Sequence, residues 1–249
     1  MERFKDRVIL ITGAASGIGR ASAIRISQEG GTIVCADIQV DAVNDTVEQI
    51  KKNNGDALAL VCDVSNEDAV NDTVAKAVSH YGKLNGLCNI AGILAFENTH
   101  EVKLADWNRI ITINLTGTFL MCKAALPHLL ETKGSIVNMS STAALAGHPW
   151  TAAYSASKGG ILALTYTLAI EYGRKGVRTN ALCPGAVSTP IQQAFRFPDG
   201  CDTTLLERIT PFDTFRPPED VAGAVAFLAS DDSIHINGTA LRIDGGMLS

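Results

Sequence analysis

Tyr154 and Lys158 stand four positions apart in the segment Tyr-Ser-Ala-Ser-Lys. On a helix, this spacing places a phenol and an amine on the same face. A neighbouring ammonium favours the phenolate, so we expect Lys158 to lower the pKa of Tyr154 from its usual value of about 10. Tyr154 is therefore a candidate general base, although the same spacing arises by chance on many helices and needs support from other residues.

A glycine-rich turn near the N-terminus is a second candidate for chemistry. The apolar segment 7–12 is typical of a buried strand, and Gly-Ala-Ala-Ser-Gly-Ile-Gly-Arg at 13–20 leads from it into helical spacing that lasts to Gly30. Such glycines let the backbone approach a pyrophosphate, which the free N–H groups of the following helix can hold. The alternative is that the glycines serve only the turn.

Asp37 favours the dinucleotide interpretation. It ends the next predicted strand, 32–37, twenty positions after Gly17. A carboxylate there accepts hydrogen bonds from ribose hydroxyls and repels a 2′-phosphate, so we expect NAD(H) as the cofactor. No arginine or lysine occupies positions 14, 15 or 38, where a phosphate clamp would be expected. A structural acid that caps the following helix is the alternative.

Strand and helix patterns alternate along the rest of the chain. Further strands are predicted at 57–64, 84–89, 135–139, 177–182 and 240–243, and helices at 66–81, 104–130, 154–172 and 219–229. Ser65 is expected to cap the first of these helices and Pro127 to bend or interrupt the second. The pattern predicts an α/β Rossmann fold: a single domain, 1–249, with a doubly wound, seven-stranded parallel sheet and helices on both faces.

Segment 189–218 does not fit this alternation. It is long and mixed in composition, with aromatic and charged residues, and it follows a strand at the edge where such sheets bind ligands. Loops of this length are usually functional, so we expect a lid over the substrate that contains some helix. The alternative is a passive insertion held down by its aromatic residues.

Composition narrows the possible partners. The 249 residues are 46% hydrophobic and 19% charged, with a net charge of -5 and a pI near 5.5, which argues against nucleic acid. No continuous apolar run reaches the roughly 18 residues that span a membrane, and no signal peptide is recognisable, so a cytoplasmic protein is expected. The six cysteines form no ligand-like pairs, which predicts buried hydrophobes and neither disulfides nor a metal.

Taken together, the motifs resemble those of the classical short-chain dehydrogenases/reductases over essentially the whole chain. The match is carried by Thr12-Gly13-x-x-x-Gly17-Ile18-Gly19, Asp63-Val64, Asn89-x-Ala91-Gly92, Asn114, Ser141, Tyr154-x-x-x-Lys158, Pro184-Gly185 and Asp244-Gly245-Gly246. One departure is Ile90, where the family often has a second asparagine, and it puts a local hydrogen bond in doubt.

The resemblance implies roles for these residues. Tyr154 would be the acid/base, and Ser141 would be the catalytic serine, with Ser140 as the weaker candidate. Lys158 would lower the pKa of Tyr154 and hold the nicotinamide ribose. Asn114 would support a water linked to Lys158. The implied cofactor-binding residues are Gly13, Ser16, Gly17, Ile18, Gly19, Asp37, Asp63, Val64, Asn89, Ala91, Gly92, Tyr154, Lys158, Pro184, Gly185, Val187 and Thr189.

The expected function is NAD-dependent oxidation of a secondary alcohol or hydroxy acid to a ketone, or the reverse reduction. A 3-oxoacyl-thioester reductase and a catalytically silent NAD-binding regulatory protein are the alternatives. The resemblance also implies a homotetramer. Substrate contacts are expected from Leu94, Ala143, His148, Trp150, Gln192 and Arg196, with Arg208 as a further polar candidate, and an arginine of the lid could bind a substrate carboxylate.

Overall fold

The computed structural model describes residues 2–193, 195–210 and 214–249, without the side chains of Gln193 and Arg208. Seven parallel strands form one sheet in the order β3-β2-β1-β4-β5-β6-β7, which confirms the predicted sheet. The strands are β1 (Val8–Thr12), β2 (Thr32–Asp37), β3 (Ala57–Val61), β4 (Gly86–Asn89), β5 (Ser135–Met139), β6 (Arg178–Pro184) and β7 (Ala240–Ile243).

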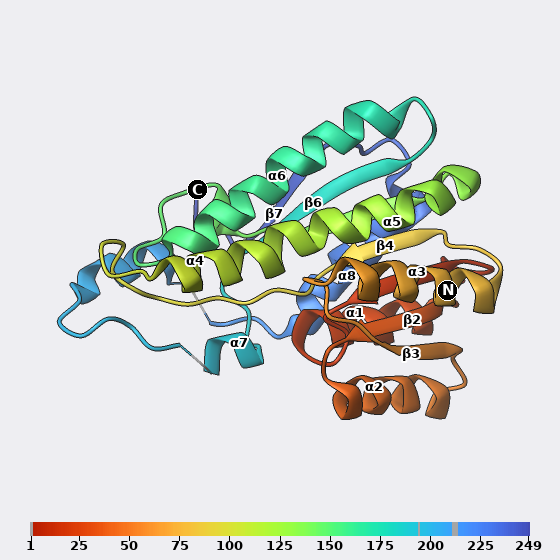
Figure 1. Ribbon diagram of the computed structural model, residues 1–249, viewed down its shortest axis with the longest axis horizontal. Coiled ribbons are helices and arrows are strands. Elements are labelled where there is room, and N and C mark those ends of the chain that lie inside the picture. Colours follow the sequence, from red (N-terminus) through yellow and green to blue (C-terminus); the bar gives the residue numbers. More distant parts are fainter. Residues whose placement is uncertain (1, 194, 211–213) are drawn as a thin grey trace.

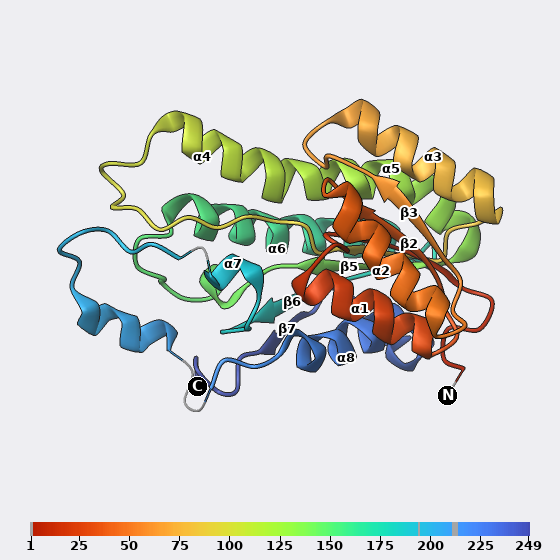
Figure 2. The ribbon, with the colours of Figure 1, turned by 90° about the horizontal axis from the view of Figure 1, so that it is seen from below.

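Helices cover both faces of this sheet (Figures 1 and 2). They are α1 (Gly17–Gln28), α2 (Val40–Lys52), α3 (Glu67–Tyr81), α4 (Leu104–Ile111), α5 (Gly117–Thr132), α6 (Ala152–Gly173), α7 (Pro190–Gln193) and α8 (Pro218–Ala229). Successive side chains of a strand point to opposite faces. In β1, Ile9 and Ile11 therefore pack with α1, α2 and α8, whereas Val8 and Leu10 pack with α3, α5 and α6.

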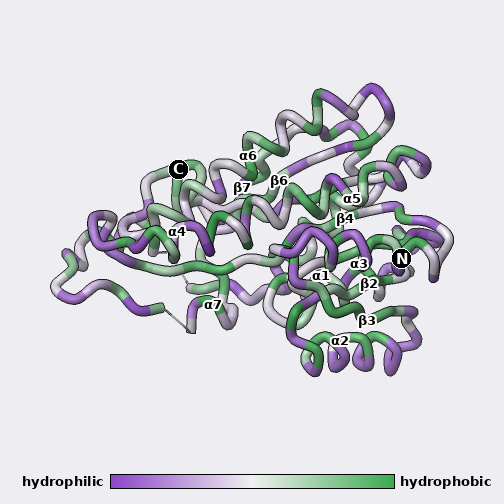
Figure 3. Tube along the Cα trace, in the orientation of Figure 1, coloured by the Kyte–Doolittle hydropathy of each residue, from purple (hydrophilic) through white to green (hydrophobic). Residues whose placement is uncertain are grey.

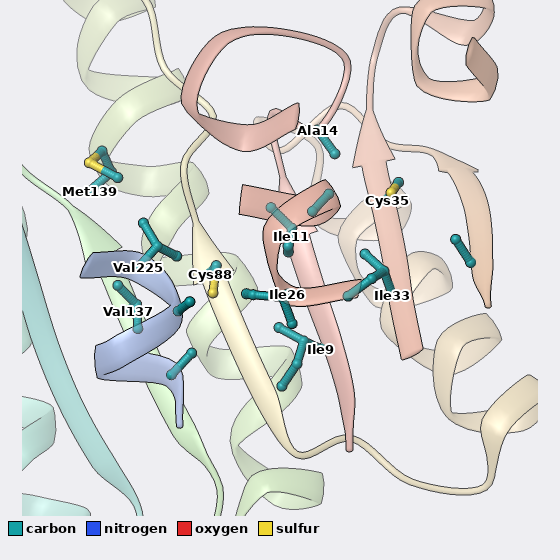
Figure 4. Close-up of a cluster of buried hydrophobic side chains, with 14 of the residues drawn as sticks. Ile9, Ile11, Ala14, Ile26, Ile33, Cys35, Cys88, Val137, Met139 and Val225 are labelled. Carbon is teal, nitrogen blue, oxygen red and sulfur yellow. The ribbon is translucent and has the colours of Figure 1, made fainter. Parts of the chain in front are cut away.

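Burial of the sheet on both faces explains why its strands are continuous apolar runs in the sequence. Figure 4 shows Ile9, Ile11, Ile26 and Ile33 packed around β1, β2 and α1, with Val225 of α8 beside Val137, and all of them are buried. In Figure 3 the hydrophobic residues concentrate along the strands, while the helices carry polar residues on their outer sides. The predicted burial of cysteine is confirmed for Cys35, Cys62, Cys88, Cys122 and Cys183, whereas Cys201 is only partly buried.

The strand order changes direction at β1 and β4, which are hydrogen-bonded neighbours. After β3 at the sheet edge, the chain returns through α3 to β4 beside β1, with Thr12 paired to Asn89. The Thr12 hydroxyl accepts hydrogen bonds from the N–H groups of Ile90 (3.0 Å) and Ala91 (3.2 Å). The glycine turn after β1 therefore lies directly against the loop after β4, at the switch point where open α/β sheets bind ligands.

Two sequence-based boundaries are corrected at the start of α3. Asn66, and not Ser65, caps this helix, because its side-chain oxygen accepts the N–H of Ala69 at 2.9 Å. The Ser65 hydroxyl instead donates to Asp63 at 2.6 Å, and the Ser65 N–H donates to the same carboxylate oxygen at 2.9 Å. This tight turn also accounts for the end of β3 at Val61, short of the predicted residue 64.

The long helical segment is irregular at a different place from the one expected. α4 ends at Ile111, a π-helical turn spans Thr112–Thr116, and α5 then runs without interruption through Pro127 to Thr132. The stretch Leu104–Thr132 is long and apolar enough to cross a membrane by length and composition alone, which the sequence analysis did not anticipate. Half of its most apolar window is buried inside the fold, as in the core helix of a globular protein.

The segment predicted as a lid contains two short helical pieces, α7 and a 3₁₀ helix at Thr203–Ile209. Its two ends are tied together: the Ser188 N–H donates to the carbonyl oxygen of Arg216 (2.8 Å), and the Arg216 N–H donates to that of Ala186 (3.2 Å). The prediction of some helix is confirmed for the described part, while positions 194 and 211–213 lie outside it.

Gly19 offers a test of this packing, because a Cβ built there would overlap the carbonyl oxygen of Gly13. We predict that Gly19→Ala lowers the free energy of unfolding by about 1–3 kcal/mol, as overpacking commonly does. Gly223→Ala is the control, since its Cβ would meet only the end of Arg25 at 3.8 Å, and greater helix propensity should raise stability by up to about 1 kcal/mol. Denaturant unfolding without nucleotide measures both; equal stability of the two variants would contradict the packing described.

Candidate active site

Tyr154 and Lys158 lie on one face of α6, as their spacing predicts, with the lysine Nζ 5.5 Å from the centroid of the tyrosine ring. Both line a single cavity of about 790 Å³ that extends from the glycine turn to the lid. The volume lies within the range of cofactor and ligand sites. One cavity thus joins the candidate proton-transfer pair to the candidate nucleotide site.

The ammonium of Lys158 is held deep in the protein. The residue is 4% exposed, and its Nζ donates a 2.8 Å hydrogen bond to the carbonyl oxygen of Met139 at the end of β5. A Cβ on Gly92 would lie 3.4 Å from this nitrogen and 3.1 Å from Oδ1 of Asn114, so the loop after β4 passes close to the amine. Burial disfavours the charged form and lowers the pKa of Lys158 to about 8.

Burial also decides the pKa of Tyr154, which is raised above its usual value of about 10. Interaction with the Ser141 hydroxyl acts in the opposite direction but is the smaller effect. The expectation that Lys158 lowers this pKa is therefore wrong for the geometry described. The reason is that the same burial penalises the phenolate and the ammonium, so it pushes the phenol's pKa up and the amine's pKa down.

Ser141 and its neighbour Ser140 are clearly distinguished by their contacts. The Ser140 hydroxyl donates to the main-chain carbonyl of Lys158 at 2.9 Å and thereby ties β5 to α6. The Ser141 oxygen accepts the N–H of Ala143 at 3.1 Å, which caps a 3₁₀ turn, and its hydroxyl interacts with the Tyr154 phenol. This arrangement favours Ser141 as the serine that faces the reacting group.

Asn114 lies inside the π-helical turn and is fully buried. Its side chain donates to the carbonyl oxygen of Ile93 (2.9 Å) and to the Ser157 hydroxyl (3.0 Å), and accepts the Ile93 N–H (2.8 Å). The residue therefore joins the loop after β4 to α6, next to Lys158. π-Helical turns are rare and frequently mark functional sites, because they change which carbonyls remain available inside a helix.

The glycine turn has the shape that a pyrophosphate needs. Gly13 and Gly17 adopt φ angles of +70° and +52°, and a Cβ on Gly13 would lie 2.9 Å from the Ala91 nitrogen. Ser16 precedes α1 but its side chain makes no capping hydrogen bond. The N–H groups of the first turn are thus left for a bound anion, which the helix dipole would also favour.

Asp37 combines a structural role with a half-buried carboxylate that lines the cavity. Its Oδ2 accepts the N–H of Ala15 and its Oδ1 accepts the N–H of Gln39, both at 3.0 Å. Asp37 therefore has a structural role, because it holds the glycine turn and the residue before α2, but the alternative of a helix-capping acid is wrong, since α2 begins without a side-chain cap. Each carboxylate oxygen has a further lone pair, and the residue lines the cavity, so ribose hydroxyls can still reach it.

The other predicted cofactor residues are brought together, with one exception. The cavity wall includes Ser16, Ile18, Gly19, Asp63, Val64, Ala91, Gly92, Pro184, Gly185, Val187 and Thr189. Asn89 does not belong to it: the residue is 3% exposed, and its amide donates to Oδ1 of Asn138 at 2.9 Å. It cross-links β4 and β5 beneath the cavity. Ile90, the departure from the family pattern, lines the cavity instead.

The predicted substrate residues divide into two groups. Leu94, His148 and Gln192 line the cavity. Ala143, Trp150 and Arg196 lie outside its wall: Ala143 is buried, Trp150 packs edge-on against Phe197, and the exposed Arg196 donates to the carbonyl oxygen of Phe195. The side chain of Arg208 lies outside the described part of the chain.

Segments 94–97 and 192–208, which the sequence predicts as walls of the substrate pocket, contribute aromatic residues to the lid end of the cavity. Phe96, Phe195, Phe197 and Phe215 line it. The aromatic content of the lid was visible in the sequence, but the contact of Phe96 with it requires the path of the loop after β4. That path depends on the clamp formed by Asn114 and has no local sequence signal.

Comparisons with known proteins agree with this geometry. Residues 13–248 match the family described as enoyl-(acyl carrier protein) reductase. Similar curated proteins include the 3-oxoacyl-[acyl-carrier-protein] reductase FabG of Thermotoga maritima, 36% identical over 99% of both chains. The 3beta-hydroxysteroid dehydrogenase 1 of Eggerthella lenta is 38% identical over 98% of this chain and 94% of its own length.

Solved structures are similar over nearly the same span. A short-chain dehydrogenase from Mycobacterium paratuberculosis bound to NAD has a TM-score of 0.92, with 30% identity over 98% of both chains. Levodione reductase has a TM-score of 0.89, with 33% identity over 98% of both chains. With the glycine turn, Ser141, Tyr154 and Lys158 gathered around one cavity, these matches show that the chain belongs to the short-chain dehydrogenase/reductase family.

Proposed function

We propose that the protein is an NAD(H)-dependent oxidoreductase that interconverts a secondary alcohol and the corresponding ketone. The observation that carries the proposal is the convergence of Ser141, Tyr154 and Lys158 on a cavity that continues to the glycine turn. The named relatives are oxidoreductases of hydroxyl and carbonyl compounds, which supports the same class of reaction.

The residues present fit a dinucleotide. The glycine turn and the uncapped start of α1 would hold the pyrophosphate. Asp37 would bind the adenosine ribose, and Asp63 and Val64 would flank the adenine. Val187 and Thr189, which follow Pro184 and Gly185, would face the nicotinamide carboxamide. The carboxylate of Asp37 and the absence of a basic residue at positions 14, 15 and 38 favour NAD(H) over NADP(H).

When bound, the nicotinamide supplies the acceptor or donor of a hydride. In oxidation, Tyr154 removes the hydroxyl proton of the alcohol, and Ser141 holds the same oxygen and stabilises the charge that develops on it. In reduction, the phenol returns that proton, a role for which its raised pKa is suited. Lys158, fixed by the Met139 carbonyl, would hold the nicotinamide ribose, and Asn114 would support a water next to Lys158.

A 3-oxoacyl-thioester reductase is the second candidate. The similarity to FabG and the description of the matched family favour it. Asp37 argues against it, because such enzymes usually use NADPH. A silent NAD-binding regulator has less support, since it would have no need of Asn114, Ser141, Tyr154 and Lys158 together.

We further propose a single domain, with 189–218 as a lid, in a cytoplasmic homotetramer that binds neither nucleic acid nor membrane. The tetramer is supported by apolar side chains on the outer faces of α5 and α6, which run side by side in Figure 1. Phe119, Tyr166 and Ile170 are 46%, 42% and 83% exposed, an arrangement that a helix pair from a second subunit would bury.

The two adjacent serines give a matched test of the catalytic assignment. We predict that Ser141→Ala lowers kcat by roughly 10²–10³-fold, as loss of one oxyanion donor does, and leaves NADH affinity unchanged. Ser140→Ala should act mainly on thermal stability, because its hydroxyl holds the Lys158 carbonyl. Turnover of secondary alcohols and ketones found in a dehydrogenase screen, followed by nicotinamide absorbance, measures both. A larger kcat loss in Ser140→Ala would overturn the assignment.

Cofactor choice can be tested at Asp37 with two variants. We predict that Asp37→Asn lowers the ratio of kcat/KM for NAD over NADP by roughly tenfold or more, because a repulsion worth about 4 kcal/mol before solvent screening is removed. Asn retains an oxygen that can accept the Ala15 N–H. Asp37→Ala loses that bond as well, so NAD binding itself should weaken. An unchanged ratio in both variants would show that Asp37 does not select the cofactor.

A further inference from the structure

Three buried polar side chains connect the sheet to α6, the helix that carries Lys158. The Asn89 amide on β4 donates to Oδ1 of Asn138 on β5 at 2.9 Å, and the Asn138 amide donates to the hydroxyl of Thr165 on α6 at 3.0 Å. Asn138 and Thr165 are fully buried, and Asn89 is nearly so. Because buried polar groups are costly to leave unpaired, these contacts favour one arrangement of β4, β5 and α6.

Thr165 joins these contacts to the face of α6 on which Lys158 lies. Its hydroxyl accepts the Asn138 N–H and donates to the carbonyl oxygen of Ile161, one turn earlier in α6, at 2.8 Å. Thr165 follows Lys158 by about two helical turns, so the two side chains lie on the same face of the helix. A contact made at Thr165 therefore acts on the face that carries the amine.

The end of β5 holds α6 at two separate points. The Ser140 hydroxyl donates to the main-chain carbonyl of Lys158 at 2.9 Å, and Asn138 holds Thr165 two turns further along the helix. Between these two points, the Met139 carbonyl accepts the Lys158 ammonium at 2.8 Å. A helix held at one point could pivot about it. The second attachment fixes the direction of α6, and with it the approach of the amine to the Met139 carbonyl.

We propose that Asn138 is a positioning residue for the reaction, which acts through Thr165 to place α6 so that Lys158 reaches both the Met139 carbonyl and the nucleotide. Asn138 and Thr165 are not among the residues that line the cavity, so their effect on catalysis is indirect. Misplacement of a catalytic group by about 1 Å can slow an enzyme roughly 100-fold. The inference rests on the proposed function and deepens it.

Thr165→Val tests this link and leaves the contact between Asn89 and Asn138 in place. Valine has nearly the shape of threonine but no hydroxyl, so Asn138 loses its partner on α6. We expect kcat for the alcohols and ketones found in a dehydrogenase screen to fall by roughly tenfold or more. The pH profile of kcat/KM should shift as well, because it reports the proton-transfer groups. NADH affinity, followed by fluorescence titration, should weaken by roughly threefold or more, since Lys158 would hold the ribose.

Two further variants serve as controls. Thr165→Ser keeps the hydroxyl and should retain most of the kcat and of the NADH affinity. Thr167→Val is the matched control, because Thr167 lies on the same helix and donates to the carbonyl oxygen four positions earlier, that of Ala163, at 3.1 Å, but is exposed. It should leave kcat, the pH profile and NADH affinity at their wild-type values.

A purely structural role for Asn138 predicts a different result. Thr165→Val would then have a lower Tm, while kcat, the pH profile and NADH affinity, measured well below that Tm, would equal those of the wild-type protein. This outcome would overturn the inference. Equal losses of kcat in Thr165→Val and Thr167→Val would also overturn it, because the contact with Asn138 would then not be the cause.

NADH binding separates this inference from the proposed function. Affinity that weakens in Thr165→Val and recovers in Thr165→Ser, in a protein without dehydrogenase activity, would support the positioning of Lys158 and contradict the proposed reaction. Turnover and NADH affinity that are the same in the wild-type protein and in Thr165→Val would support the proposed reaction and contradict the role of Asn138.

Discussion

Burial of the Lys158 ammonium is the constraint on which the site depends. A charged amine that is 4% exposed persists only where the protein supplies partners for it, and here the Met139 carbonyl does so. The surroundings are built accordingly: Gly92 leaves room where a Cβ would crowd the amine, and Asn114 clamps the adjoining loop to α6. Ser140 ties the lysine's own carbonyl to the end of β5.

The same buried region links the candidate proton-transfer pair to the proposed nucleotide site. Gly92 belongs to the loop after β4, and the neighbouring Ala91 donates to Thr12 at the end of β1, where the glycine turn begins. Asp37 holds that turn from the other side through the N–H of Ala15. The loop after β4 therefore contacts both the glycine turn, through Thr12, and α6, through Asn114, and a nucleotide bound at the turn would share one cavity with Lys158.

Much of the fold and of the candidate site could be predicted from the sequence. The features that could not be predicted depend on contacts between residues far apart in the chain. The β1 strand, the glycine turn and the Tyr154 spacing were predictable because each depends on neighbours in sequence. The direction in which the Tyr154 pKa shifts was not predictable, because burial is a property of the assembled fold. Asn89 was misplaced for a similar reason: its side chain turns to Asn138 on the adjacent strand, a contact set by sheet register. The π-helical turn at Asn114 replaced the expected irregularity at Pro127.

The central claim is that Tyr154 carries the proton, and Tyr154→Phe tests it most directly. This change removes the hydroxyl and keeps the ring that packs beside Lys158. The account predicts that NADH binding, followed by fluorescence titration, stays within about threefold of the wild-type affinity, while kcat falls by roughly 10²–10⁴-fold, the contribution of a general acid or base. Turnover at the wild-type rate with NADH bound normally would contradict the account.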